Sequence, residues 1–362
     1  MEKPKKILVF RIGQLGDMII SIPAMQEIRN AFPLSSIVLL TDNHIGKNYL
    51  SALDIVPQNL YDRIINYPAK LGGVELKIES IVFLNNLRKE KFDSLMYLAP
   101  SNRTEVQIFR DVFLFRMLGI QKIYGHKRSS VNKYILPNHI AKNECDFLLD
   151  CLDISGIPVP KLTERTLNLN LSSKELDSAE SWIKSKVLSS FSDKILIGIG
   201  PGSKAPSKKW SFENFLNLGK LIIKNFEVIP IVFGGPEDKI IGDKLVKGWG
   251  FGLNTAGEFN VRQSAAGLSF CSLYIGNDTG TMHLAAGVGI TCLAIFSAQD
   301  IIGKWHPYGQ NHHILRKQTE CEGCRLFLCD KSNYCLQLIT VEEVYACFCK
   351  IMNNNIQPLL FQ

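Results

Sequence analysis

The chain has 362 residues, a formal net charge of +7 and 46% hydrophobic residues. This is about twice the length of a typical domain, so we expect two domains, each with its own core. No apolar run approaches the roughly 18–20 residues that a bilayer needs. The run after the basic N-terminus stops at Arg11, too early for a signal peptide. We therefore expect a cytoplasmic protein and neither a membrane-spanning nor a secreted one.

The modest positive charge suits an anionic ligand or an anionic membrane surface. We expect no nucleic-acid partner, because the sequence has no recognition module and no long basic stripe. The ten cysteines are expected to be mostly thiols in a cytoplasmic chain. Four of them lie in apolar sequence and are expected in the core: Cys145, Cys151, Cys271 and Cys292.

In chain order, short β-branched runs alternate with helical patterns, which is typical of parallel α/β sheets. The first series has strands at 5–10, 36–41 and 93–100, with a helix at 17–32. The polar, proline-containing segment 155–180 reads as a linker leading into a helix. The second series follows it, and its predicted strands are 194–202, 228–235, 272–278 and 290–297, with helices at 211–226, 261–270 and 340–352. The fold class is α/β, with domains at 1–175 and 176–362.

Ligands of parallel sheets collect beyond the carboxyl ends of the strands, where helix N-termini offer free N–H groups. "GPGSKAPSKKW" follows one strand, and there Ser203 and Lys208 join glycines that permit close backbone approach. "GNDTGTMHLAAG" follows another, with Asp278 and Thr279 at the start of a helix. Two such turns in one domain favour an anion site, with Asp278 better suited to a ribose hydroxyl than to phosphate.

Simpler interpretations exist for each residue. Asp17, Asp278 and Thr279 are also good helix caps. The lysines beside Trp210 could form a solvated loop, and a histidine on a helix face, such as His283, is more often structural. A dinucleotide site is disfavoured, because "GQLGD" has G-x-x-G rather than G-x-G-x-x-G.

Four motifs, "ILVFRIGQLGDMIISIPAM", "GPGSKAPSKKWSFENF", "FGGPED" and "GNDTGTMHLAAGVGITCLAIF", together resemble glycosyltransferase family 9, the ADP-heptose:lipopolysaccharide heptosyltransferases. The resemblance covers nearly the whole chain. It implies the GT-B architecture, in which two Rossmann-like domains with parallel sheets face each other across a cleft. The first domain would bind the acceptor and the second the nucleotide sugar, without a cofactor or metal for catalysis.

The resemblance also assigns roles. Asp17 matches the general base that deprotonates the acceptor hydroxyl, and Lys208 matches the lysine that neutralises the donor diphosphate. Glu237 falls near a ribose-binding carboxylate, and Phe259 falls where an apolar residue packs on the base. Gly13 and Gln14 lie where several relatives have hydroxyl residues near the phosphates. The implied nucleotide-sugar site comprises Gly13, Gly16, Gly202, Ser203, Lys208, Glu237, Phe259, Asp278, Thr279, Gly280, Thr281 and His283.

Four cysteines lie within fifteen residues of the tail: Cys321, Cys324, Cys329 and Cys335. Four thiolates at C-x-x-C spacing could hold one structural zinc or iron ion, although the pairs are closer than in most zinc ribbons. Disulfides and unligated thiols are the alternatives. A similar cluster binds metal in the related autotransporter heptosyltransferases.

The sequence thus predicts an inverting, metal-independent glycosyltransferase that moves a heptose from ADP-heptose to a lipopolysaccharide inner-core acceptor. It would work at the inner membrane as a peripheral cytoplasmic protein, with the basic segments 1–6 and 124–134 near the anionic surface. The alternatives are another sugar, a protein acceptor of the autotransporter type, a nucleotide-sugar epimerase or hydrolase, and a non-catalytic nucleotide-binding module.

Overall fold

The structure, a computed structural model, describes residues 4–41, 52–67, 78–128, 131, 134–135, 140–187 and 194–356. Parts of the predicted basic segments, residues 1–3, 129–130 and 132–133, lie outside this description. The chain forms two compact units, Met1–Leu169 and Asn170–Gln362. Among the described helices, none combines the length and hydropathy that crossing a bilayer requires.

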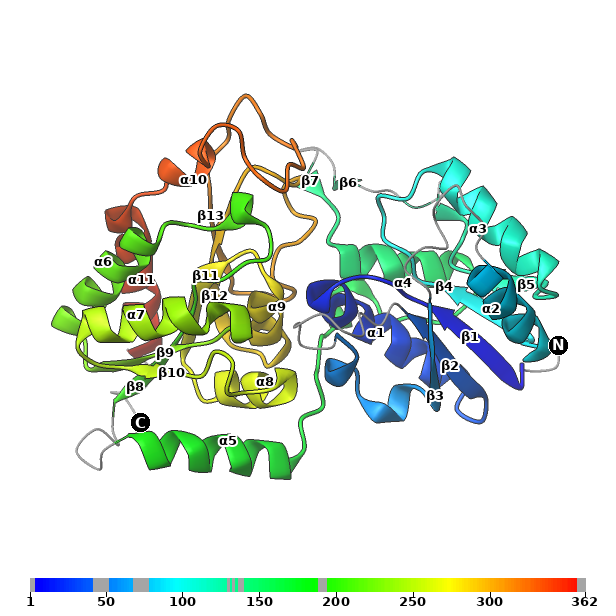
Figure 1. Ribbon diagram of the computed structural model, residues 1–362, viewed down its shortest axis with the longest axis horizontal. Coiled ribbons are helices and arrows are strands. Elements are labelled where there is room, and N and C mark those ends of the chain that lie inside the picture. Colours follow the sequence, from blue (N-terminus) through cyan, green and yellow to red (C-terminus); the bar gives the residue numbers. More distant parts are fainter. Residues whose placement is uncertain are drawn as a thin grey trace. The chain divides into compact units, whose positions relative to one another are not determined.

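The first unit is built on a parallel sheet in the order β3-β2-β1-β4-β5 (Figure 1). Its strands are β1 (Lys6–Phe10), β2 (Ser36–Thr41), β3 (Arg63–Asn66), β4 (Ser94–Tyr97) and β5 (Lys122–Tyr124). Its helices are α1 (Leu15–Ala31), α2 (Ile78–Lys89), α3 (Glu105–Met117) and α4 (Glu144–Ile154), and β6 (Tyr134–Ile135) pairs with β7 (Ile140–Ala141) in a short antiparallel ribbon. The strands are apolar on both faces, as expected where helices cover a sheet on both sides.

Helices α1 and α4 pack together, whereas α2 and α3 contribute to a separate core against the sheet. That core contains Leu8 and Tyr97 from the strands, Leu87 from α2, and Ile108 and Phe115 from α3. A capping box starts α3, since the side chain of its N-cap Thr104 accepts a hydrogen bond from the backbone N–H of Gln107.

The second unit has a six-stranded parallel sheet in the order β10-β9-β8-β11-β12-β13 (Figure 1). The strands are β8 (Ile195–Gly200), β9 (Val228–Val232), β10 (Leu253–Asn254), β11 (Leu273–Asn277), β12 (Thr291–Phe296) and β13 (His313–Arg316). The helices are α5 (Ser173–Lys186), α6 (Phe212–Asn225), α7 (Lys239–Trp249), α8 (Val261–Ser269), α9 (Gly280–Gly287), α10 (Tyr334–Gln337) and α11 (Val341–Ile356). The predicted two-sheet α/β architecture is confirmed.

One face of this sheet forms the core with α6, α7 and α11, while α5, α8 and α9 form a second packed group. Glycines in β8 and β11 make room for Tyr274. A Cβ at Gly200 would lie 1.8 Å from the Tyr274 hydroxyl, and one at Gly276 would lie 2.4 Å from it. Packing around Tyr274 therefore explains the glycines at these two positions. The unit boundary at 169/170 precedes α5, which packs on α8.

Candidate functional site

The carboxyl ends of four neighbouring strands in the second unit, β10, β9, β8 and β11 in sheet order, carry the turns that the sequence singled out. The turn after β12, which the sequence did not single out, lies beside them. Parallel strands place all of these turns along one edge of the sheet. This edge therefore brings together Gly202, Ser203, Lys208, Glu237, Phe259, Asp278, Thr279 and Gly280.

Lys208 is the centre of the charged cluster at this edge. Its Nζ lies 2.6 Å from Asp278 Oδ2 and 2.8 Å from Asp300 Oδ2, and all three side chains are largely shielded from solvent. Burial opposes the charged form of Lys208, but the two carboxylates outweigh burial and raise its pKa. Burial raises the pKa of Asp278, and Lys208 works against that shift. The cluster therefore holds a permanent cation in a partly dry environment.

The turn that carries Lys208 is held on several sides. The side-chain Oδ1 of Asn277 accepts the backbone N–H of Trp210 at 3.0 Å, while its Nδ2 donates to Pro201 O at 2.8 Å. The buried Trp210 indole donates to Ile339 O at 2.9 Å. Trp210 is thus an anchor in the core rather than part of a solvated loop.

The segment 321–335, which contains the four tail cysteines, forms hydrogen bonds with the same turn. Ser207 Oγ donates to Leu326 O at 2.6 Å, and Asn333 Nδ2 donates to Pro206 O at 2.8 Å and to Lys209 O at 3.4 Å. The segment also reaches the turn after β12, because Gln299 Nε2 donates to Leu326 O at 2.8 Å. These contacts link the backbone on either side of Lys208 to residues 326–333.

Cys321, Cys324 and Cys329 are half-buried thiols, and Cys335 is buried. Burial raises the pKa of Cys335, and Cys321 and Cys329 act in the same direction. The backbone N–H of Ala298 donates to Cys335 Sγ at 3.3 Å. Within the described residues, no three Cys, His, Asp or Glu side chains are arranged to hold a metal ion.

Asp238 is a second buried carboxylate at the edge. Burial and then the charge of Glu237 raise its pKa, and its Oδ2 accepts the backbone N–H of Gly235 at 3.2 Å. A Cβ at Gly202 would lie 2.2 Å from Asp238 Oδ2, so only glycine fits beside this carboxylate. Glu237 itself is exposed.

Thr279 is the N-cap of α9, and Gly280 is its first residue. Thr281 is half-buried one residue further on. His283 is buried in the same helix. Burial, together with the charge of Lys208, lowers its pKa to about 3. Its Nδ1 has no hydrogen-bond partner among the described residues, which leaves a neutral imidazole close to the Lys208 cluster.

Phe259 follows β10, but its ring is buried in the protein. It packs edge-on against Trp182 of α5, with ring centroids 4.7 Å apart. A Cβ at Gly267 would lie 3.0 Å from the Phe259 ring. Phe259 therefore packs between α5 and α8, beneath the surface of this sheet edge.

In the first unit, Asp17 lies in the first turn of α1, beyond the carboxyl end of β1. Its Oδ2 accepts the backbone N–H of Gln14 at 3.0 Å, as a capping residue does. Its Oδ1 lies 3.3 Å from Nη2 of the fully buried Arg11, which also donates to Asp17 O at 2.6 Å. Gly13 has a φ of +150°, and a Cβ there would lie 2.5 Å from Asp17 Cβ. Gly16 lies one residue before Asp17 in the same turn.

Sequence reasoning missed several of these residues. Asp300 lies in an irregular turn, and only its position after a predicted strand could have signalled it. Asn277 directly precedes Asp278 in a motif already identified. Arg11 and Asn333 act through contacts with residues distant in space, which no local pattern reveals.

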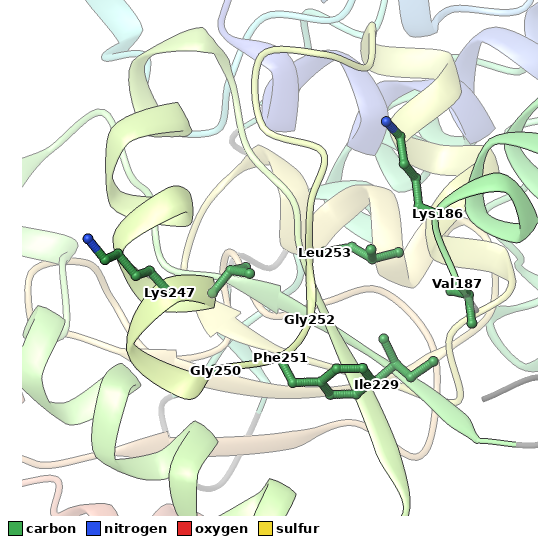
Figure 2. Close-up of a pocket in the computed structure, with 9 residues that line it drawn as sticks. Lys186, Val187, Ile229, Lys247, Gly250, Phe251, Gly252 and Leu253 are labelled. Carbon is green, nitrogen blue, oxygen red and sulfur yellow. The ribbon is translucent and has the colours of Figure 1, made fainter. Parts of the chain in front are cut away.

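One pocket among the described residues of this unit lies away from this edge. It has a volume of about 490 Å³ and is lined by Lys186, Val187, Ile229, Val246, Lys247, Gly250, Phe251, Gly252 and Leu253. Figure 2 shows the Phe251 ring beside Ile229, with Lys186 and Lys247 at the margins. These residues cluster at the amino ends of β9 and β10, so the pocket is separate from the edge that carries Lys208.

Comparison with known proteins decides the family. The profile of glycosyltransferase family 9 (heptosyltransferase) matches residues 85–335, which is more than half of the chain. The chain belongs to glycosyltransferase family 9. It is therefore a glycosyltransferase, as the sequence motifs predicted.

This family 9 chain is 24% identical over 298 residues to the lipooligosaccharide heptosyltransferase 2 of Haemophilus ducreyi, covering 78% of this chain and 80% of that protein. Its fold is similar to that of a family 9 glycosyltransferase from Veillonella parvula, with a TM-score of 0.69 and 22% identity. The match covers 98% of this chain and 99% of that one. The E. coli ADP-heptose lipopolysaccharide heptosyltransferase II gives a TM-score of 0.65 at 19% identity, covering 97% and 99%. These likenesses show the GT-B fold.

Proposed function

We propose that this glycosyltransferase transfers a heptose from ADP-heptose to a lipopolysaccharide inner-core acceptor, with inversion at the anomeric carbon. The observation that carries the proposal is the shielded Lys208 cation at the carboxyl edge of the second sheet. Cleavage of a glycosyl diphosphate develops a second negative charge on the terminal phosphate of the leaving group and an oxocarbenium-like centre on the sugar. A cation fixed beside that leaving group stabilises the charge as it develops. The donor and acceptor named in family 9 relatives point to the same reaction.

In this proposal, Lys208 exchanges a protein carboxylate for the donor diphosphate. Asp278 and Asp300 keep its ammonium charged and aimed along the edge until the donor arrives. The N-terminus of α9 and the hydroxyl of Ser203 add donors to phosphate oxygens. Asp278 and Glu237 take ribose hydroxyls, and residues near Phe259 cover the base. The remaining donor contacts come from Gly202, Thr279, Gly280, Thr281 and His283, with Gly13 and Gly16 on the first unit.

Asp17 acts as the general base in this proposal. The hydrogen bond from Gln14 and the charge of Arg11 fix the carboxylate at the end of β1. It accepts the proton of the acceptor hydroxyl while the hydroxyl oxygen attacks the anomeric carbon, and the bond to the diphosphate oxygen breaks on the opposite side. The products are the glycosylated acceptor and ADP.

The acceptor in this proposal is a glycolipid, so the enzyme works against the cytoplasmic face of the inner membrane. The overall charge of +7 supports attraction to an anionic surface. We assign acceptor binding to the first domain and donor binding to the second. We keep a structural zinc or iron ion at the four tail cysteines as a prediction, supported by their C-x-x-C spacing and close succession in the sequence. Ligation would need these thiols to draw closer than they lie here.

The proposal is tested in two steps. Thermal unfolding is measured with ADP, UDP, GDP and dTDP, and ADP is expected to stabilise the protein most. At about a hundred times its dissociation constant, a ligand adds roughly 2.7 kcal/mol. The enzyme is then incubated with ADP-heptose and a heptose-deficient lipopolysaccharide acceptor, and mass spectrometry follows the acceptor. A gain of one heptose supports the proposal. ADP release without acceptor, or preference for another nucleotide, contradicts it.

A further inference from the structure

Helix α3 is apolar on two opposite faces. Its inward face supplies Ile108, Val112 and Phe115 to the core of the first unit. The opposite face carries Val106, Phe109, Phe113 and Met117, which are 58–78% exposed. We call these four side chains the α3 stripe. An ordinary surface helix has one apolar face and one polar face, so a second apolar face indicates a partner.

The stripe is continuous. Its residues are spaced by three or four positions, which aligns them along one side of a helix. The rings of Phe109 and Phe113 stack with centroids 6.4 Å apart. At these exposed fractions the four side chains present roughly 500 Å² of apolar surface, the size of the largest patches on monomeric proteins, which are often functional.

The charges around the stripe favour a lipid surface. Arg110 and Arg116 flank it on its two sides by helical spacing and are exposed, and Arg110 also pairs with Asp111 Oδ1 at 2.8 Å. Lys122 is exposed just after the helix. Of the two acidic residues of α3, Glu105 is exposed in the first turn, and Asp111 is buried, with its Oδ2 accepting the Tyr97 hydroxyl at 2.7 Å. An apolar stripe bordered by arginines is the pattern of helices that lie in the interface of an anionic bilayer.

A second copy of the chain fits the stripe less well. A standard protein interface buries about 800 Å² per partner, which exceeds what the stripe offers. Pairing two stripes would also bring the flanking arginines of both copies close together, and like charges oppose association.

We propose that the α3 stripe inserts into the interfacial region of an anionic membrane and anchors the first unit there. The inference rests on the proposed glycolipid acceptor for its purpose. The helix begins beyond the carboxyl end of β4, and β4 pairs with β1, whose carboxyl end precedes Asp17. The anchor therefore starts at the same sheet edge as the proposed base, where an acceptor held in the bilayer has to reach it.

The test is sedimentation with vesicles of phosphatidylglycerol and phosphatidylethanolamine, without donor or acceptor, at 100 and 500 mM NaCl. We expect Phe109→Ser/Phe113→Ser to lower the partition coefficient at least tenfold at both salt concentrations. Leu34→Ser is the matched control, because Leu34 is an isolated apolar residue of the same unit with 99% exposure, and it should bind as wild type does. Arg116→Gln should weaken binding at 100 mM and not at 500 mM, since salt screens only the charge.

Circular dichroism confirms folding, which is expected because the substituted rings are exposed. The inference is overturned if wild type fails to sediment with the vesicles, or if the double variant binds like wild type. It is also overturned if size-exclusion chromatography shows a wild-type dimer that the double variant dissociates while vesicle binding stays the same. Transfer to a detergent-solubilised acceptor is assayed separately and should be equal in wild type and double variant. If wild type transfers no sugar to the solubilised acceptor, the proposed function is refuted, while the vesicle-binding result still stands.

Discussion

Replacing Lys208 tests the donor site most sharply, because the structure separates its effect on binding from its effect on stability. Methionine keeps most of the volume of the side chain and removes the charge. A charge-assisted contact in a shielded site contributes about 1.5–3 kcal/mol, so Lys208→Met should weaken ADP binding about tenfold to a hundredfold. The effect should lie near the upper end, because Asp278 and Asp300 would then face the diphosphate without a counter-ion.

The same substitution should cost stability. Breaking a buried ion pair costs about 3–5 kcal/mol, and the partial solvent access of Asp300 reduces this to about 2–3 kcal/mol. The double variant Lys208→Met/Asp300→Asn removes one of the two uncompensated carboxylates. It should therefore recover part of the stability and bind ADP more tightly than Lys208→Met, though less tightly than wild type. Isothermal titration calorimetry and denaturant unfolding measure both quantities. Unchanged ADP affinity in Lys208→Met, or weaker binding in the double variant than in the single one, would refute this reasoning.

Three further predictions concern the surroundings of this cluster. Burial and Lys208 lower the pKa of His283 to about 3 in the folded protein. As the pH falls below about 6.5, His283 is therefore protonated in the unfolded chain but not in the folded one, and the folded state loses stability. Between pH 7 and pH 5, the free energy of unfolding of His283→Gln should therefore fall by about 2 kcal/mol less than that of wild type, as measured by denaturant unfolding. An equal fall in both proteins would contradict a neutral, buried His283. Asn333→Asp removes the amide N–H groups that bond to Pro206 O and Lys209 O, so it should raise the KM for the nucleotide sugar about tenfold with little change in kcat. The control Ser332→Asp should change neither constant. Steady-state kinetics of both variants measures the two constants. If the tail cysteines hold a structural metal, elemental analysis of protein purified without chelator should find near one equivalent of zinc or iron, and chelation should lower the Tm; finding neither metal would reject the idea.

The α/β architecture was predictable because its signals are local. Runs such as 37–40 and 228–232 are apolar along their whole length, and buried parallel strands require that pattern. The turns around Lys208 and Asp278 were predictable because function in such sheets gathers at strand ends. Both turns lie on adjacent strands, β8 and β11.

The remaining features depend on contacts between distant residues. Asp300 is 92 residues away from Lys208 in sequence, and Asn333 is 127 residues away from Pro206, so neither contact leaves a periodic pattern. Arg11 reads as the end of an apolar strand, yet the fold buries it completely and aims it at Asp17. Helix α3 was not predicted, because apolar residues on both of its faces hide the alternation that marks a surface helix.

The central claim is that Asp17 is the base of an inverting transfer, and Asp17→Asn tests it most directly. Asparagine keeps an oxygen for the Gln14 backbone N–H but loses the ion pair with the buried Arg11, so stability should fall by about 1–2 kcal/mol while ADP affinity barely changes. Loss of the proton acceptor should lower turnover about a hundredfold to ten-thousandfold with ADP-heptose and the inner-core acceptor. A rate within a few fold of wild type would show that Asp17 serves only the helix and that the base lies elsewhere.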